Sequence, residues 1–350
     1  MPLPAHDIPP FKGLPGLVWA LRFDAEGRAE RLDVDAIDAA EPGAERPGWL
    51  WLHFNQGDAR TARVIEQQLD LPDSAKEALL THDAHANLYL EDGLAHGALV
   101  DWQHGGVDNS QLSYARCEQD VGWLHFVMGE HLLVTARRQG LRSVEQARRH
   151  AAAGGLYEAP EQLLEAIVER FGASIAHATL ELDSELARIE ARVHGQDTGA
   201  ARRELALLRR QAVHMHRPLS AQRRVLRQFE QRHRAQRQHP LVATALHLSQ
   251  QFDEVDSEVG ALQARARLLH EEVAAKLTEA TNRHLHTLSI LTALLVPPTL
   301  VVGAFGMNMD LPFAHQPHAF AVVTGLCVLS SITVYLLLRR IGVARVRAGG

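Results

Sequence analysis

The chain has 350 residues, 46% of them hydrophobic, and a formal net charge of −6. This length allows more than one domain with a buried core, and the mildly acidic balance gives no general reason to expect a nucleic-acid partner. Only two cysteines are present, Cys117 and Cys327, which argues against a disulfide scaffold or a cysteine zinc finger. The N-terminal stretch lacks the basic and apolar regions of a secretory signal, so most of the chain is expected in the cytosol.

The first part of the chain alternates strand-like and helix-like runs, which predicts an α/β domain over residues 1–155. Asp58 is expected to cap a helix that ends near Leu69, because its carboxylate can accept N–H groups of the first turn. The small residues at 151–155 mark the predicted boundary. Strands are predicted at residues 17–23, 49–54, 93–100, 122–128 and 131–136.

Long helical patterns follow at residues 161–193 and 201–238, and a third begins at Pro240. Residues 156–281 are therefore predicted to form a helical domain and stalk. Proline suits the first turn of the third helix, where its missing N–H is not needed. If this helix is continuous to Phe305, it is on the order of 100 Å long. Such a helix needs partners, either the preceding helices or copies of itself.

Residues 201–238 are rich in arginine and contain only two acidic residues, Glu204 and Glu230. A basic stretch is one feature of nucleic-acid binding proteins. However, Phe229 is the only aromatic residue here, and acidic helical stretches flank the segment. We therefore predict interhelical charge pairing or a solvated face, and no nucleic-acid partner.

Two stretches near the C-terminus, residues 285–309 and 320–338, contain no Asp, Glu, Lys or Arg. Each reaches the roughly 20 residues that a helix needs to cross a bilayer; a pair of buried core helices is the alternative. Arginine and lysine occur before the first stretch and after the second but not between them, so both flanks are expected in the cytoplasm. The predicted order is a first membrane helix at 282–309, an external loop at 310–319, a second membrane helix at 320–338 and a basic cytosolic tail at 339–350.

The first membrane helix carries its small and polar residues on one face. Two helices of one chain cannot enclose an aqueous path in lipid, so a pore requires several copies of the chain. The pattern suits a pore lining, and it equally suits a helix-to-helix contact face. In a pore, Leu285 and Val296 would form dry constrictions. The stripe consists of Asn282, Leu285, Ser289, Thr292, Val296, Thr299 and Gly303.

Residues 282–308, NRHLHTLSILTALLVPPTLVVGAFGMN, resemble the signature region of the CorA metal-ion transporter family. The triplet Gly306-Met307-Asn308 ends an apolar span and precedes a short loop and one last helix, which is its position in the family. Asn282, Pro297, Thr299 and Gly303 also match. The segments WLWLHFN, LLVTARR and LPFAH look closer to the ZntB zinc-transporter branch than to the magnesium members.

The triplet has a physical interpretation as the motif that admits the ion. Divalent ions hold their first water shell tightly, and a ring of neutral carboxamides from Asn308 can hydrogen-bond those waters without removing them. Gly306 would allow close approach of backbones, and Met307 would pack rather than coordinate.

The sequence departs from the family pattern in three places. Phe305 replaces the common Tyr before the triplet, and Pro298 follows Pro297, which predicts a local kink. The loop lacks the acidic run of many magnesium members and has Asp310, His315 and His318 instead. These three residues suit a weak zinc-collecting site or are ordinary solvated loop residues. The departures favour zinc over magnesium.

Two further histidine pairs invite a functional interpretation. His284 and His286, next to the membrane entrance, are candidate pH-sensitive groups. His214 and His216 lie two residues apart on a predicted helix and so point to different faces, which is poor geometry for a shared metal.

The resemblance implies a homo-oligomer, pentameric in the family, that carries a divalent cation across the inner membrane in contact with lipid. Zinc is the expected ion, with proton coupling implied by the ZntB likeness and no permanently bound cofactor. No Walker loop, GxSxG elbow or HExxH motif occurs, so no enzyme activity is predicted. The alternatives are a magnesium, cobalt or nickel channel of the same family and a membrane-anchored scaffold or sensor without transport.

Overall fold

The computed structural model describes residues 14–32, 48–82, 85–103, 121–194, 198–236, 239–306 and 318–340. The chain divides into two compact units, residues 1–270 and 271–350. The predicted boundary at 151–155 falls inside the first unit, at a turn where Gly154 has a φ of +95°.

A seven-stranded sheet with the order β2-β1-β3-β7-β6-β5-β4 forms the N-terminal part of the first unit. The central pair, β3 and β7, is parallel and every other neighbouring pair is antiparallel. The five predicted strands are confirmed to within two residues at each end, and β2 and β4 were missed. Both are short edge strands, with too few residues for an alternation of apolar and polar side chains to be recognised. The bounds are β1 Leu17–Phe23, β2 Ala29–Arg31, β3 Trp49–Asn55, β4 Asn87–Glu91, β5 Leu94–Trp102, β6 Val121–Met128 and β7 Leu132–Arg137.

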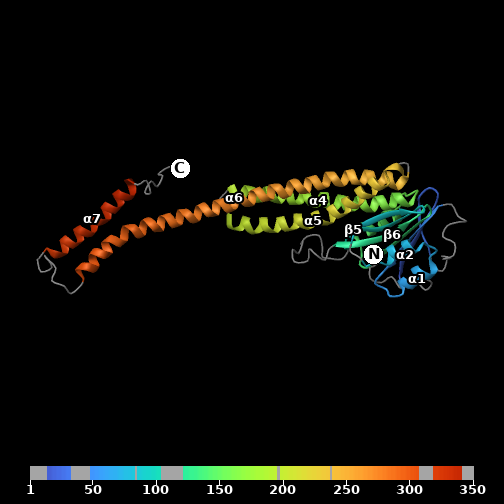
Figure 1. The fold of residues 1–350 in the computed structure, drawn as a ribbon, viewed down its shortest axis with the longest axis horizontal. Coiled ribbons are helices and arrows are strands. Elements are labelled where there is room, and N and C mark those ends of the chain that lie inside the picture. Colours follow the sequence, from blue (N-terminus) through green and yellow to red (C-terminus); the bar gives the residue numbers. More distant parts are fainter. Residues whose placement is uncertain are drawn as a thin grey trace. The chain divides into compact units, whose positions relative to one another are not determined.

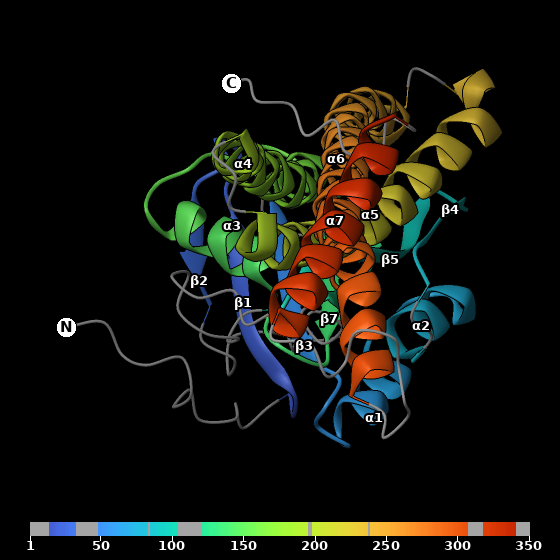
Figure 2. The ribbon, with the colours of Figure 1, turned by 90° about the vertical axis from the view of Figure 1, so that its left-hand side faces the viewer.

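Helices cover both faces of the sheet. The short helices α1 (Thr61–Gln68) and α2 (Asp73–Leu80) lie on one face, and α3 (Arg142–Ala152) and α4 (Pro160–His194) lie on the other (Figure 2). The side chains of β3 point alternately toward these two helical layers, because successive side chains of a strand point to opposite faces. One buried cluster joins α1 and α2 to the sheet through Leu50, Leu52, Phe54, Val64, Ile65, Ala75, Leu79 and Val134.

The predicted cap at Asp58 is wrong in its detail. Helix α1 begins at Thr61, and the residue before it, Arg60, makes no side-chain cap. The Asp58 carboxylate instead accepts the backbone N–H of Arg60 at 2.9 Å and pairs with its guanidinium at 2.7 Å. These bonds to Arg60 lower the pKa of Asp58 to about 2. The carboxylate therefore orders the turn that leads into the helix.

A buried carboxylate ties α3 to the sheet. Asp101, at the end of β5, accepts hydrogen bonds from the backbone N–H and the hydroxyl of Ser143 in the first turn of α3, at 2.9 and 2.6 Å. Burial raises the pKa of Asp101 to about 6, because the charged form loses its hydration. In the same unit, the Gln222 side chain of α5 accepts the N–H of Val100 at 2.9 Å and so joins α5 to β5.

Two long helices follow the α/β part, and a third begins in the same unit. Helix α4 is followed by α5 (Thr198–Arg232) and α6 (Pro240–Phe305). Figure 1 shows α4, α5 and the first part of α6 side by side. Helix α5 ends six residues before the predicted position, because a 3₁₀ turn at Arg234–Gln236 leads into Pro240. Proline disfavours a helical conformation in the residue before it, which separates the two helices.

Ion pairs between these helices confirm the predicted interhelical pairing of the arginine-rich segment. Arg223 of α5 contacts Asp256 of α6 at 2.6 Å, and Arg227 pairs with Asp253. Outside that segment, Arg265 of α6 bridges Asp183 and Glu190 of α4 at 2.9 and 2.6 Å.

The second unit contains the last part of α6 and the final helix α7 (Ala319–Arg340), which runs back alongside it (Figure 1). Each has a window long and apolar enough to cross a membrane by length and composition, and among the described residues no residue of either window is buried. Core helices of soluble proteins with similar length and composition are mostly buried, so exposure favours the membrane interpretation.

Candidate functional site

Helix α7 covers one face of the apolar part of α6. The half-buried residues of α6 recur at helical spacing, as do those of α7 that face it. The α7 set contains small residues, which allow two helices to approach closely within a membrane. The α6 set is Ile290, Ala293, Leu294, Pro297, Pro298, Val301 and Phe305, and the α7 set is Val323, Cys327, Ser330, Ser331, Val334 and Leu338.

A serine of α7 compensates for a proline of α6. Pro298 has no N–H, so the carbonyl of Leu294 loses its partner one helical turn ahead. The Ser331 hydroxyl donates to this carbonyl at 3.4 Å. An unsatisfied carbonyl is unfavourable in lipid, and a hydroxyl from a neighbouring helix is one way of satisfying it. Helix α6 continues through both prolines to Phe305. The role of Ser331 was not predicted from the sequence, although a serine on a second apolar helix was a usable signal.

We expect Ser331→Ala to loosen the contact between the two apolar helices. The substitution leaves the Leu294 carbonyl without its donor, which is expected to cost about 1 kcal/mol in a membrane protein. Thermal unfolding of the whole protein in detergent should therefore begin at a lower temperature. Ser330→Ala is the matched control, because that hydroxyl donates within its own helix, to the carbonyl of Cys327 at 2.8 Å. Equal shifts for the two variants would contradict the assigned role.

The predicted polar stripe lies on a face of α6 that α7 does not cover. At 100° per residue, its seven members occupy a sector of about 100° that does not overlap the face toward α7. All seven are exposed within the chain: Asn282, Leu285, Ser289, Thr292, Val296, Thr299 and Gly303. The stripe is therefore available to another copy of the chain or to an aqueous path.

The threonines of the stripe present acceptor oxygens to their surroundings. The hydroxyl of Thr292 donates to the carbonyl of Leu288 at 2.8 Å, and that of Thr299 donates to the carbonyl of Leu295 at 2.7 Å. Because each hydroxyl proton is used within the helix, the remaining lone pairs can accept hydrogen bonds from water. Such a surface suits a hydrated cation better than an anion.

The residues predicted at the mouth of the pore are only partly placed by the structure. Gly306 follows α6 in a turn, where its N–H donates to the carbonyl of Val302 at 2.9 Å. Met307, Asn308, Asp310 and His315 lie outside the described residues, so their proposed roles remain predictions. His318 is exposed just before α7, and so are His284 and His286 on α6.

The histidine pair on α5 does point to different neighbours, as predicted. The ring of His214 stacks on Trp102 with 5.7 Å between centroids, whereas His216 Nε2 lies 3.2 Å from an Asp256 oxygen. The two rings do not form a shared metal site.

Comparison with known proteins decides the family. The profile of the family described as "CorA-like Mg2+ transporter protein" matches residues 47–340, which is most of the chain. The chain belongs to this family. Its CorA-type architecture, with an N-terminal α/β domain, long helices and two candidate membrane helices at the C-terminus, is the fold class predicted from the sequence.

Relatives of this CorA-family chain are named as zinc transporters. The "Zinc transport protein ZntB" of Pectobacterium atrosepticum is 24% identical over 87% of this chain and 89% of its own length. The protein of the same name from an Enterobacter species is 26% identical over 85% of this chain and 86% of its own. The predicted resemblance to the ZntB branch is thereby confirmed.

Solved structures of low identity share the CorA-family fold. Full-length CmaX has a TM-score of 0.73 at 19% identity, covering 93% of this chain and 97% of its own. The CorA magnesium transporter from Methanocaldococcus jannaschii has a TM-score of 0.70 at 15% identity, covering 92% and 98%. The cytoplasmic domain of ZntB from Vibrio parahaemolyticus has a TM-score of 0.56 at 13% identity, covering 75% and 99%.

Proposed function

We propose that the chain is one subunit of a homo-oligomeric transporter that carries divalent metal cations across the inner membrane, with zinc as its preferred ion. The observation that supports this proposal most directly is the stripe on α6, which is exposed in the single chain and presents hydroxyl acceptors at Thr292 and Thr299. Family membership and the names of the relatives supply the class of cargo.

The stripe requires neighbours to act as a pore. One chain offers α6 and α7, and two helices cannot separate water from lipid on all sides. A ring of subunits with α6 inside and α7 outside would place the stripe around a common axis, and family likeness favours five subunits. Lipid would then contact the exposed apolar residues of α7, such as Phe320 and Leu329, which are 84% and 60% exposed in the single chain.

In this arrangement the ion enters with its first water shell. The Asn308 carboxamides would meet it at the outer mouth, and the threonine hydroxyls would accept hydrogen bonds from its waters further in. Leu285 and Val296 would form narrow apolar rings that stay dry when the pore is closed. Proton coupling, which the ZntB likeness suggests, has no carboxylate at residues 285–309 or 320–338 to carry it. His284 and His286, next to the membrane entrance, are candidate pH-sensitive side chains.

Uptake into proteoliposomes tests the proposal. Purified protein should accumulate zinc faster than protein-free vesicles, and zinc should enter faster than magnesium when both are tested at the same concentration. Cobalt and nickel are tested in parallel, each with and without a pH gradient, and the mass of the detergent-solubilised protein should be that of a multi-subunit ring. If magnesium entered faster than zinc, magnesium would replace zinc as the proposed cargo. Uptake of none of these ions by correctly assembled protein would favour a membrane-anchored scaffold or sensor.

We expect a cysteine at Gln316 to be labelled from outside intact cells by a membrane-impermeant maleimide. The loop between the two apolar segments has no Lys or Arg, whereas arginine follows the second segment, and such asymmetry places the loop outside. The background carries Cys117→Ser and Cys327→Ser. Gly349→Cys in the basic tail is the control and should react only after permeabilisation. The reverse pattern of labelling would overturn the topology.

A further inference from the structure

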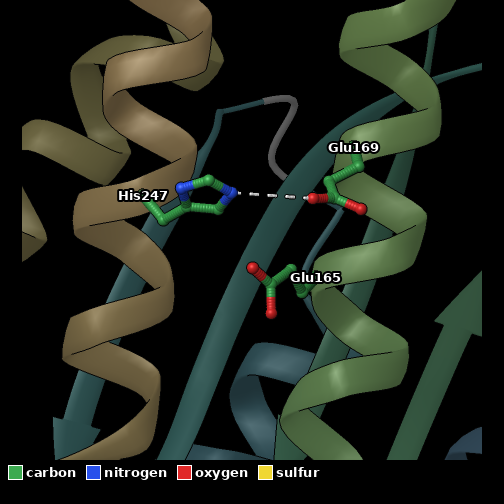
Figure 3. Close-up of side chains that lie close together, drawn as sticks. All are labelled: Glu165, Glu169 and His247. Carbon is green, nitrogen blue, oxygen red and sulfur yellow. Dashed lines mark ion pairs between the residues drawn. The ribbon is translucent and has the colours of Figure 1, made fainter.

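Three potential metal ligands from two helices converge in the first unit, outside the membrane segments. Glu165 and Glu169 lie one turn apart on α4, and His247 faces them from α6 (Figure 3). One donor atom from each side chain lies within 4.8 Å of the other two. Because the donors come from separate helices, an ion held by all three would join α4 to the beginning of α6.

The two carboxylates lack the cations that usually accompany such a pair. Glutamates at i and i+4 on a helix repel each other. Among the residues that the structure describes, no lysine or arginine forms an ion pair with Glu165 or Glu169, and the imidazole of His247 lies 3.9 Å from Glu169. Burial raises the pKa of Glu165, and the charge of Glu169 raises it further. The site therefore has an uncompensated negative potential.

The imidazole of His247 does not compensate this negative charge by a direct hydrogen bond to Glu169. His247 Nε2 lies 3.9 Å from the nearest Glu169 oxygen, which is beyond hydrogen-bond distance. The Gln251 amide nitrogen lies 3.0 Å from the same Nε2 and donates to it. This hydrogen bond uses the single lone pair of Nε2, so a metal ion bound there would have to displace the Gln251 amide; neutral imidazole is the form that binds metals.

Further contacts hold the ligands in place. The hydroxyl of Thr244, one turn before His247, donates to a Glu165 oxygen at 3.4 Å. Such outer hydrogen bonds orient metal-binding carboxylates. His247 also borders a groove of about 350 Å³ between α5 and α6, lined in addition by Glu230, Val242, Ala243, Leu246 and Gln250. The imidazole is 54% exposed and Glu169 is 42% exposed, so an ion and its remaining waters have access.

We propose that Glu165, Glu169 and His247 form an exchangeable site for a transition-metal dication such as Zn²⁺. One imidazole with two carboxylates suits zinc, cobalt or nickel, whereas Mg²⁺ takes oxygen ligands. Zinc–ligand bonds of 2.0–2.1 Å in a tetrahedral site place donors about 3.3 Å apart, so small side-chain rotations complete the geometry. Water occupies the fourth position, and Gln251 releases Nε2 to the metal. Occupancy of this site is independent of transport through the membrane helices.

Cobalt is a suitable probe, because its visible spectrum reports nitrogen and oxygen ligation. The full-length protein in detergent is titrated with Co²⁺ alone, and hydrogen exchange is then followed with and without Zn²⁺. Binding should slow exchange in residues 160–170 and 240–251 together, since the ion joins these two segments. His247→Ala should abolish this paired protection and weaken the corresponding cobalt signal at least about tenfold, given that loss of even an outer partner of a metal ligand costs roughly 10–100-fold. Glu165→Gln with Glu169→Gln should do the same while preserving side-chain volume.

The control is a similar pair that has no third donor grouped with it among the described residues. His177 and Glu181 lie one turn apart on the same helix, with 3.6 Å between Nδ1 and a carboxylate oxygen. His177→Ala should leave the cobalt spectrum and the paired protection unchanged. The site would be refuted by protection that persists in His247→Ala, or by the absence of paired protection in the unmodified protein at saturating Zn²⁺. Zinc uptake measured on the same variants separates this result from the transport proposal, because uptake can persist without the site.

Discussion

Replacing Val296 by tryptophan should stop ion uptake, whereas the same replacement at Leu291 should leave most of it. Both side chains lie on the apolar part of α6, and both are exposed within one chain, Val296 by 57% and Leu291 by 52%. Neither substitution therefore disturbs packing against α7. Five residues separate them, which places them about 140° apart around the helix. Val296 belongs to the polar stripe and Leu291 does not.

The expected difference follows from the ring arrangement. Every subunit contributes one copy of residue 296, so a single substitution places several indole rings around the same level of the pore. An apolar constriction excludes water when the pore is closed. With the indole rings in place, it cannot widen enough for water and the ion to pass. At Leu291 the indole faces lipid or a neighbouring helix, where a large apolar side chain is tolerated. Zinc uptake into proteoliposomes, with assembly checked by mass, measures both variants. Equal uptake by both would show that the stripe does not line the path.

Much of the α/β part could be predicted because its signals are local. Strands β3 and β7 carry long apolar runs bounded by turns, and these were located correctly. The short edge strands β2 and β4 and the helices α2 and α3 were missed. The edge strands pair with their chain neighbours β1 and β5, but they are too short for an alternation of side chains to be recognised. Helices α2 and α3 are held by contacts from distant parts of the chain, such as the bonds that Ser143 donates to Asp101 across 42 residues. The sequence of a short segment carries no local signal of a partner so far along the chain.

The candidate pore face was predictable for a different reason. Helical periodicity places residues such as Thr292 and Thr299 on one face regardless of tertiary structure. Periodicity alone did not distinguish a pore face from a helix contact face. The structure adds that α7 packs on a different sector, through Pro298, Cys327 and Ser331. This removes contact with α7 as the explanation of the stripe, while contact with another subunit remains compatible with a pore.

The cluster around His247 could not be found from sequence spacing. Glu165 and Glu169 are an ordinary i, i+4 pair on a charged helix, and the histidine is 78 residues further along the chain. Only the packing of α6 against α4 brings the three together. The usable signal was weaker: two like charges one turn apart, without a lysine or arginine at a compensating position on the same helix.

The other large effect is expected at Asn308. Asn308→Ala removes a short neutral carboxamide that can hydrogen-bond the waters of a hydrated ion, while alanine leaves the end of the helix able to form. Assembly should therefore survive and zinc uptake should fall sharply. Asn308→Asp keeps the size of the side chain but adds a ring of negative charge. It should bind the ion more tightly and release it slowly, because conduction requires binding that is not too strong.

The two Asn308 variants are thus expected to fail for different reasons, and the concentration dependence of uptake separates them. Weak capture in Asn308→Ala should raise the zinc concentration needed for half-maximal uptake, whereas slow release in Asn308→Asp should lower both that concentration and the maximal rate. Thr287→Ala is the control, since Thr287 lies off the stripe and its hydroxyl donates to the carbonyl of Arg283 in its own helix at 2.9 Å. Its uptake should match the unmodified protein. Unchanged uptake of zinc, nickel, cobalt and magnesium by Asn308→Ala would mean that the triplet does not admit the ion, and the mouth of the pore would have to be sought elsewhere on α6.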